Sequence, residues 1–146
     1  MANVGSKGRI KRAQEAAEDT RAQEHQHLAE RLHLIFAVTA AGLEANFNQL
    51  QESISGWNTH QGFWQSDNSG EKIALMHSEL SEALEADRKD LPSDKLEGFS
   101  GVEEELADTI IRILDFAGYH ELRLAEAVIA KLQHNLARPY MHGKKY

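Results

Sequence analysis

Two pairs of carboxylates stand out in the sequence because each pair has the spacing of about one helical turn. Glu79 and Glu82 form the first pair, and Glu105 and Asp108 form the second. Side chains three residues apart project from the same face of a helix, so each segment would direct two carboxylates the same way. Two such pairs facing one another would supply the oxygen ligands that a hard cation such as Mg²⁺ prefers. The pattern therefore indicates metal-assisted chemistry.

The first pair is carried by a predicted helix that begins after Asn68 and ends before Leu91-Pro92. At about 100° per residue its apolar residues share one arc, and the two glutamates lie on the flank of that arc. The residues of the arc are Ile73, Met76, Leu80, Ala83 and Leu84.

The second pair lies on a predicted helix that is apolar over most of its circumference. Only a narrow polar stripe remains, made of Glu105, Asp108, Arg112 and Asp115. A helix that is apolar nearly all round is expected to be buried, where carboxylates without a cation are costly. The alternative is a solvated acidic face on which Arg112 neutralises acids of its own helix. We favour the metal cage, because one arginine cannot balance so many acids.

These motifs resemble those of the MazG-like all-α nucleoside triphosphate pyrophosphohydrolases. The resemblance covers residues 57–146 and is carried by SELSEALEADRKDLPSDKLEGFSGVEEELADTIIRILDFA and KLQHNLARPYMHGKKY. The family signature is Glu-Glu-x-x-Glu, a spacer and Glu-x-x-Asp, and this sequence departs from it at the first Glu, where it has Ser78. The resemblance implies four ligands for Mg²⁺, with Mn²⁺ as a substitute: Glu79, Glu82, Glu105 and Asp108.

A predicted loop before the first acidic helix, SGWNTHQGFWQSDN, is rich in glycine, asparagine and aromatic residues. Trp57, Phe63 and Trp64 would either cap the end of a helix bundle or stack on a nucleobase. In the second case Asn58 or His60 would hydrogen-bond to the edge of the base. The resemblance implies a base pocket built from such aromatic residues, and it does not distinguish Phe63 from Trp64.

The last predicted helix, at residues 120–137, carries a polar line of Lys131, Asn135 and Arg138. From the residues alone this line is an ordinary exposed edge. The resemblance implies that Lys131 and Asn135 contact the nucleotide. The basic tail at residues 139–146 either is solvated or closes on phosphates.

Composition bounds the class of protein. The 146 residues suffice for one domain, and a net charge of −7 argues against nucleic-acid binding. The absence of cysteine is compatible with a reducing cytosol. No apolar run approaches the ~20 residues of a membrane span, so we expect a cytoplasmic protein without membrane contact. Two prolines and long periodic segments predict an all-α class.

The predicted fold is an antiparallel four-helix bundle of the MazG-like type at residues 25–146, preceded by a polar helical extension at residues 1–24. Within the extension, residues 1–8 are expected to be a loose end. The first bundle helix is predicted at residues 28–54, with an apolar face that would serve to pair subunits.

Local signals predict the ends of the two acidic helices. Gly118 is expected to end the second helix, and Glu104 is expected to be a solvated acid in its first turn, favoured by the helix dipole. Two pairs have the spacing of a capping box that starts a helix: Asn68 with Glu71, and Ser100 with Glu103.

The function that the resemblance implies is hydrolysis of (deoxy)nucleoside triphosphates to a nucleoside monophosphate and pyrophosphate by a homodimer or homotetramer, a pool-cleaning task. The metal would polarise a phosphoryl oxygen, and Glu79 or Glu82 would accept a proton from the attacking water. Lys131 and Arg112 would neutralise the phosphates, and a deoxypyrimidine is the expected base. The alternatives are phosphoribosyl-ATP hydrolysis and a non-catalytic helical oligomer or nucleotide sensor.

Overall fold

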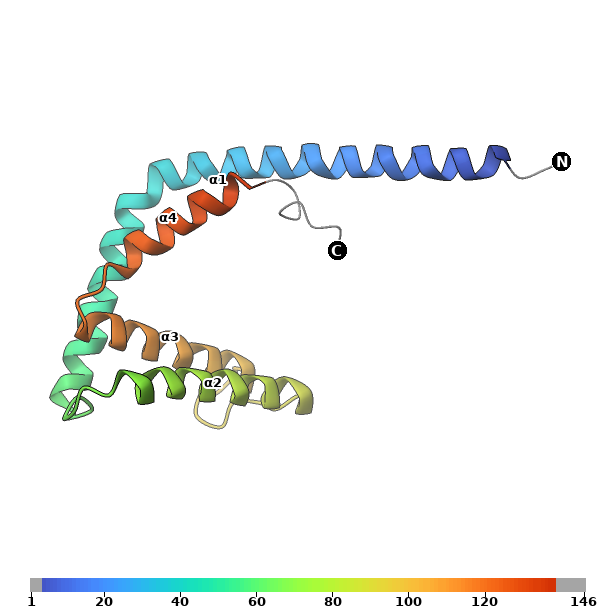
Figure 1. Ribbon diagram of the computed structural model, residues 1–146. Coiled ribbons are helices and arrows are strands. Elements are labelled where there is room, and N and C mark those ends of the chain that lie inside the picture. The colour runs from blue at the N-terminus through green and yellow to red at the C-terminus, as the bar shows by residue number, and fades with distance from the viewer. Residues whose placement is uncertain (1–3, 139–146) are drawn as a thin grey trace. The chain divides into compact units, whose positions relative to one another are not determined.

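A computed structural model describes residues 4–138, with side chains described at residues 11–35 and 39–138. Within that range the regular elements are four helices (Figure 1), so the predicted all-α class is confirmed. They are α1 (Val4–His60), α2 (Ser69–Lys89), α3 (Gly101–Tyr119) and α4 (Leu124–Leu136). In this described part of the chain, none of the helices is long and apolar enough to cross a membrane.

Contacts divide the chain into two compact units, of which the second carries the two acidic helices. One unit combines Met1–Leu43 with Glu126–Tyr146, and the other is Glu44–Ala125. In the second unit α2 and α3 pack against each other as an antiparallel hairpin, joined by residues 90–100 (Figure 1). Both carboxylate-bearing helices therefore lie side by side.

The start of α2 confirms Asn68 as its N-cap. The Asn68 side chain accepts a hydrogen bond of 3.1 Å from the backbone N–H of Glu71. The reciprocal half of the predicted box differs, because the Glu71 carboxylate accepts from the Asn68 side-chain amide rather than from its backbone. The helix ends at Lys89, where Asp90 adopts a left-handed conformation with φ of 49° and its N–H bonds back to the last turn.

The start of α3 confirms the second capping box in full. Ser100 Oγ accepts from the backbone N–H of Glu103 at 3.2 Å. The Glu103 carboxylate in turn accepts from the backbone N–H of Ser100 at 2.7 Å. Two donors that the helix itself leaves unsatisfied are thereby paired.

Gly118 does not end α3, contrary to the prediction, because the helix runs on to Tyr119. A Cβ atom built on Gly118 would lie 2.5 Å from Ser55 Cβ and 2.9 Å from the backbone oxygen of Gln51, both on α1. Only a residue without a side chain allows this approach. The glycine serves helix packing rather than a left-handed turn.

The predicted boundaries of α1 are wrong at both ends. The helix begins at Val4 and continues to His60, so it includes most of the predicted loose end at residues 1–8 and joins the predicted helix at residues 28–54. Residues 1–3 lie outside the described residues. Trp57 and His60 consequently lie on a helix and not in a loop. No proline precedes Pro92 to stop the helix, and near its end Gln51 Nε2 donates a hydrogen bond of 3.1 Å to the Leu122 carbonyl.

The last helix begins at Leu124 rather than at the predicted His120. Between them Glu121 has a φ of 52°, which an α-helix does not allow. The backbone N–H of Leu122 bonds instead to the carbonyl of Ala117 at 2.8 Å, closing the turn after α3.

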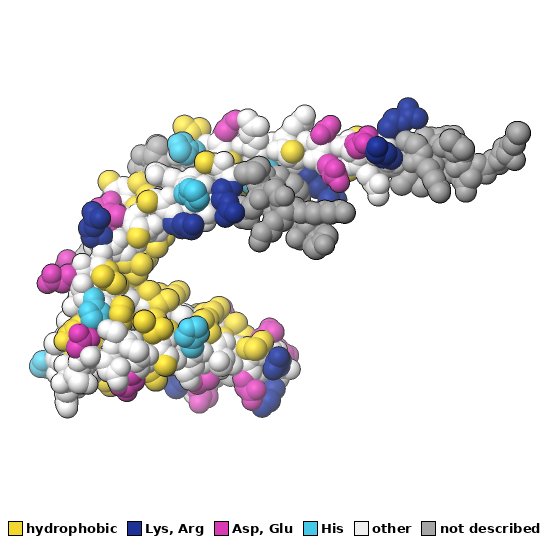
Figure 2. Space-filling model, in the orientation of Figure 1, with side chains coloured by type: hydrophobic (Ala, Val, Ile, Leu, Met, Phe, Trp, Pro, Cys, Tyr) yellow, Lys and Arg dark blue, Asp and Glu magenta, His cyan; other side chains and the backbone are white. Residues whose placement is uncertain are grey.

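The apolar faces of α2 and α3 are not fully covered within one chain. The core of the second unit includes Leu114, which is 1% exposed, with Ala83, Ala86 and Ala117. The predicted burial of an all-round apolar α3 is therefore wrong for the single chain, and Figure 2 shows hydrophobic side chains gathered along the hairpin. The exposed apolar face, between 36% and 54% exposed at each residue, comprises Ile73, Leu80, Leu84, Leu106, Ile110 and Ile113.

Candidate metal centre

Three carboxylates converge between α2 and α3. Glu79 of α2 offers one ligand oxygen, Glu105 and Asp108 of α3 offer one each, and all three oxygens lie within 4.8 Å of one another. Glu79 is only 6% exposed, and the two acids of α3 are half-buried. An all-oxygen donor set of this kind fits a hard divalent cation such as Mg²⁺ or Mn²⁺. We refer to these residues as the acid cluster.

Glu82 does not join the acid cluster, although it belongs to the predicted ligand set. Its side chain is exposed, and its Oε1 accepts a hydrogen bond of 3.1 Å from Ser78 Oγ on the same helix. Ser78, where the MazG-like signature has a glutamate, therefore orients Glu82. Glu82 still lies close enough for its charge to act on Glu105.

The electrostatics of the cluster show a local deficit of positive charge. Burial raises the pKa of Glu105 above its ordinary value of 4.5, and the neighbouring Glu79 carboxyl and the charges of Glu82 and Glu79 raise it further. The nearby ammonium of Lys95 acts in the opposite direction. Adding a divalent cation would relieve this repulsion.

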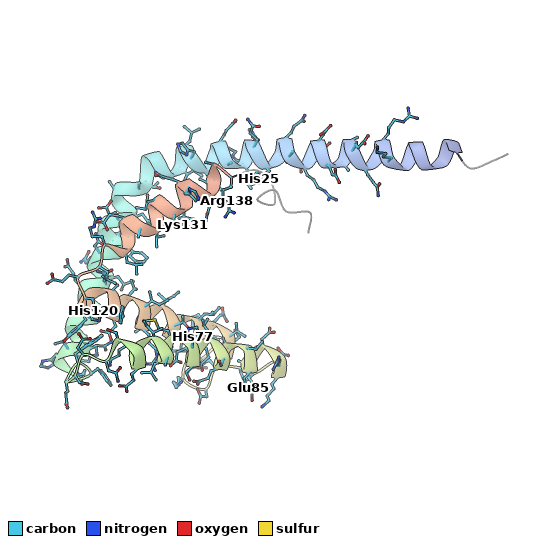
Figure 3. The ribbon with its side chains drawn as sticks, in the orientation of Figure 1. His25, His77, Glu85, His120, Lys131 and Arg138 are labelled. Carbon is cyan, nitrogen blue, oxygen red and sulfur yellow. The ribbon has the colours of Figure 1, made fainter. Side chains whose placement is uncertain are left out.

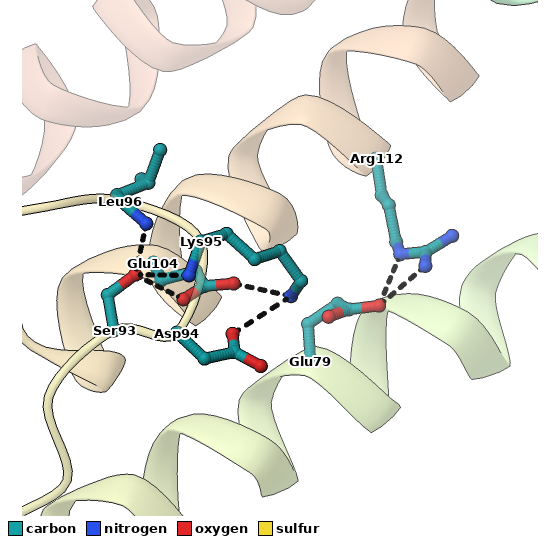
Figure 4. Close-up of polar contacts among 7 residues, drawn as sticks. All are labelled: Glu79, Ser93, Asp94, Lys95, Leu96, Glu104 and Arg112. Atoms are coloured by element: carbon teal, nitrogen blue, oxygen red, sulfur yellow. Dashed lines mark hydrogen bonds and ion pairs between the residues drawn. The ribbon is translucent and has the colours of Figure 1, made fainter.

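Arg112 forms an ion pair with Glu79 across the two helices. Its Nε and Nη2 atoms each lie 2.6 Å from Glu79 Oε1 (Figure 4). If the acidic face were solvated, Arg112 was expected to neutralise an acid of its own helix. In the structure Arg112 instead pairs with Glu79 of α2. The guanidinium thus borders the acid cluster.

The segment between the helices is held by Glu104, which the sequence predicted to be solvated. That prediction is wrong, because Glu104 is 4% exposed and accepts hydrogen bonds from Ser93 Oγ and Lys95 Nζ (Figure 4). The Lys95 ammonium and the Ser93 hydroxyl lower the pKa of Glu104 below its ordinary value, and Glu104 raises that of Lys95. Ser93 Oγ also accepts from the backbone N–H of Leu96 at 2.8 Å.

A cavity of about 600 Å³ adjoins the acid cluster, because Asp108 of the cluster lines it together with Arg112, the partner of Glu79. This volume is within the range of small-molecule sites, about 300–1,000 Å³. The other lining residues come from the end of α1, the turn before α2, and the facing sides of α2 and α3. They include Asn58, Phe63, Trp64, Gln65, Lys72 and Asp115.

The two aromatic residues of the turn have different roles. The Trp64 indole stacks on Tyr119 with ring centroids 3.7 Å apart, donates from Nε1 to Asp115 at 2.9 Å, and has the Lys72 ammonium 4.6 Å from its centroid. Phe63 lines the same cavity but is 61% exposed. Phe63 therefore presents an exposed aromatic ring at the cavity. The sequence missed the partners of Trp64, and only the place of Asp115 on the polar stripe pointed to one of them.

The remaining predicted site residues do not line the cavity. Two of them lie at the end of α1, and two lie in the unit that does not carry the acid cluster. Trp57 and His60, at the end of α1, have ring centroids 6.4 Å apart and do not line the cavity. Lys131 and Asn135 lie on α4 (Figure 3 labels Lys131), in the unit that does not carry the acid cluster. The basic tail at residues 139–146 lies outside the described residues.

Comparison with protein-family models, curated protein sequences and solved structures finds no match for this chain.

Proposed function

We propose that the chain is a Mg²⁺-dependent nucleoside triphosphate pyrophosphohydrolase, with Mn²⁺ as a substitute metal. The observation that carries the proposal is the acid cluster at the edge of a cavity large enough for a nucleotide. The resemblance to the MazG-like signature supports cleavage to a nucleoside monophosphate and pyrophosphate. Such an enzyme would clean the nucleotide pool of the cytoplasm.

In this proposal the three residues of the acid cluster hold the metal. When bound, Mg²⁺ supplies positive charge that stabilises the phosphate oxygens and lowers the pKa of water. Glu82 is the better candidate for general base of the two that the sequence suggests, because its carboxylate is exposed and outside the cluster. The hydrogen bond from Ser78 would keep that carboxylate in one orientation.

Substrate recognition would use the residues of the cavity. Phe63 offers an exposed ring for stacking on the base, and the Asn58 and Gln65 amides line the same cavity, where they would hydrogen-bond to its edge. Arg112 lies between the cluster and the cavity, where it would meet the phosphates. Contacts of Lys131 and Asn135 with the nucleotide stay a prediction of the resemblance.

The exposed apolar face supports an assembly of at least two copies. Pairing the α2–α3 hairpins of two chains would complete an antiparallel four-helix bundle and bury the apolar residues of both. A homodimer or homotetramer would follow. Light scattering should show a mass of two or four times 16.4 kDa for the native chain. The combined Leu80→Glu and Ile110→Glu substitutions should lower the mass to that of one chain. A native monomer at micromolar concentration would contradict this assembly.

The deciding experiment is a panel of nucleoside triphosphates with Mg²⁺ and identification of both products. We expect pyrophosphate release by the native chain and a loss of about 100-fold or more in kcat/KM for Glu105→Gln and Asp108→Asn. Glu85→Gln is the matched control, since Glu85 is an exposed glutamate of α2 paired with Lys89. Phosphoribosyl-ATP belongs in the panel, because exclusive turnover of it would identify the alternative enzyme.

A non-catalytic nucleotide-binding oligomer is the second candidate. The observation that favours it is the Arg112–Glu79 ion pair, which satisfies a predicted metal ligand with a protein cation. Mg²⁺-dependent nucleotide binding without turnover of any substrate would favour this candidate over the enzyme.

A further inference from the structure

Arg112 borders both parts of the candidate site. Its side chain is 40% exposed, and it lines the cavity, while the Glu79 side chain with which it pairs is 8% exposed. Both contacting nitrogens approach the same oxygen, Glu79 Oε1. One guanidinium thus connects a buried carboxylate of the acid cluster with the space that a substrate would occupy.

A divalent cation and Arg112 would compete for Glu79. The ligand oxygens of Glu79, Glu105 and Asp108 lie together, so a cation held by them stands next to the guanidinium. Like charges at that separation repel, and the repulsion is strong because the site is partly buried. Because Arg112 is partly exposed and lines the cavity, its guanidinium can move into the cavity.

We propose that Arg112 is a mobile counter-ion that links metal binding to phosphate binding. It neutralises Glu79 and is displaced toward the cavity by a divalent cation, where its guanidinium binds a phosphate of the incoming ligand. Guanidinium groups suit this exchange, since they bind carboxylate and phosphate with the same pair of donors. The competition for Glu79 rests on the metal site of the proposed function, and the phosphate half rests also on its proposed substrate.

The competition is tested with Mn²⁺ alone, measuring free Mn²⁺ by electron paramagnetic resonance in titrations of the full chain. Arg112→Gln should bind Mn²⁺ on the order of tenfold more tightly than the native chain, and Arg112→Lys should fall between them. Arg88→Gln is the matched control, because it removes the same charge from the exposed last turn of α2 and should change the affinity less than about twofold. Unchanged or weaker Mn²⁺ binding by Arg112→Gln would overturn the proposal.

The link to phosphate is tested with inorganic tripolyphosphate, which carries no base. In the native chain saturating Mn²⁺ should tighten tripolyphosphate binding, and in Arg112→Gln this gain should shrink by about tenfold. An undiminished gain would overturn the link. Circular dichroism checks that Arg112→Gln folds, and Arg112→Lys, which keeps the charge, replaces it in both titrations if it does not.

The two proposals fail in different ways. Mn²⁺ competition without turnover of any nucleotide would reject the pyrophosphohydrolase and support the counter-ion. Turnover with Mn²⁺ affinity unchanged in Arg112→Gln would support the enzyme and reject the counter-ion.

Discussion

The indole Nε1–H of Trp64 donates a hydrogen bond of 2.9 Å to Oδ1 of Asp115, a carboxylate that is 7% exposed. With Tyr119 stacked on the same indole, this contact fixes the turn before α2 onto α3. Phe63, the preceding residue, stays exposed beside the cavity. Of these two adjacent aromatic residues, one is held in the fold and the other presents an exposed ring beside the cavity.

Substitution of these two residues should separate stability from binding. Trp64→Phe leaves Asp115 buried without its donor and should lower the free energy of unfolding by about 1–3 kcal/mol in urea denaturation. Phe63→Ala should change that free energy by less than about 0.5 kcal/mol but raise KM about tenfold through lost base stacking. Equal destabilisation by both substitutions would contradict this division.

The Glu104 contacts should make stability depend on pH at both ends. Because the pKa of Glu104 is lowered, its contribution is present above 4.5 and is lost as pH falls through the lowered value. Because the pKa of Lys95 is raised, its contribution is present below 10.5 and is lost as pH rises through the raised value. Glu104→Gln should lower the thermal midpoint at pH 7 by ~5 °C and flatten its fall in acid. Glu97→Gln, in the same connecting segment, should leave both properties as in the native chain.

Metal binding should weaken in acid because of Glu105. Its pKa is raised above 4.5 by burial and by neighbouring acids, so protons compete with the metal at a higher pH than for an ordinary glutamate. The Mg²⁺ affinity should fall by up to about tenfold per pH unit below the raised value, with proton release detectable by calorimetry in buffers of different ionisation enthalpy. Without a metal, ionising Glu105 above its raised pKa costs stability, so Mg²⁺ should raise the thermal midpoint more at pH 8 than at pH 5. Glu105→Gln should abolish this difference.

Close packing at Gly118 should make that position intolerant of any side chain. Gly118→Ala places a Cβ 2.5 Å from Ser55 Cβ, and it should lower the free energy of unfolding by about 1–3 kcal/mol. Gly56→Ala is the control on α1, since a Cβ there meets nothing within 4 Å and should stabilise the helix by up to about 1 kcal/mol. Chemical denaturation of the two variants measures the contrast, and a stable Gly118→Ala would mean that α1 and α3 separate more easily than the structure shows.

Signals that act within one helical turn were predictable from the sequence. The all-α class, the caps Asn68 and Ser100, and the box formed by Ser100 with Glu103 depend on residues a few positions apart. Glu105 and Asp108 project from the same side of α3 because they are three residues apart, which is about one helical turn.

Features that depend on distant partners were not predictable. Glu104 is buried because Ser93 and Lys95 of the connecting segment donate hydrogen bonds to it. The charge pattern of α3 does not indicate these contacts. Glycine is the residue type that commonly ends a helix, so Gly118 was predicted to end α3. Its actual role is to allow the close approach of Ser55 on α1. Arg112 had three acids within reach on its own helix, and only the pairing of the helices selects Glu79.

The cavity lining and the acid cluster all come from one continuous stretch, residues 58–116. Contacts between residues close in sequence form quickly, because little chain entropy is lost in closing them. During synthesis this stretch leaves the ribosome before the segment that becomes α4, so the cavity and the acid cluster can form before that segment has emerged.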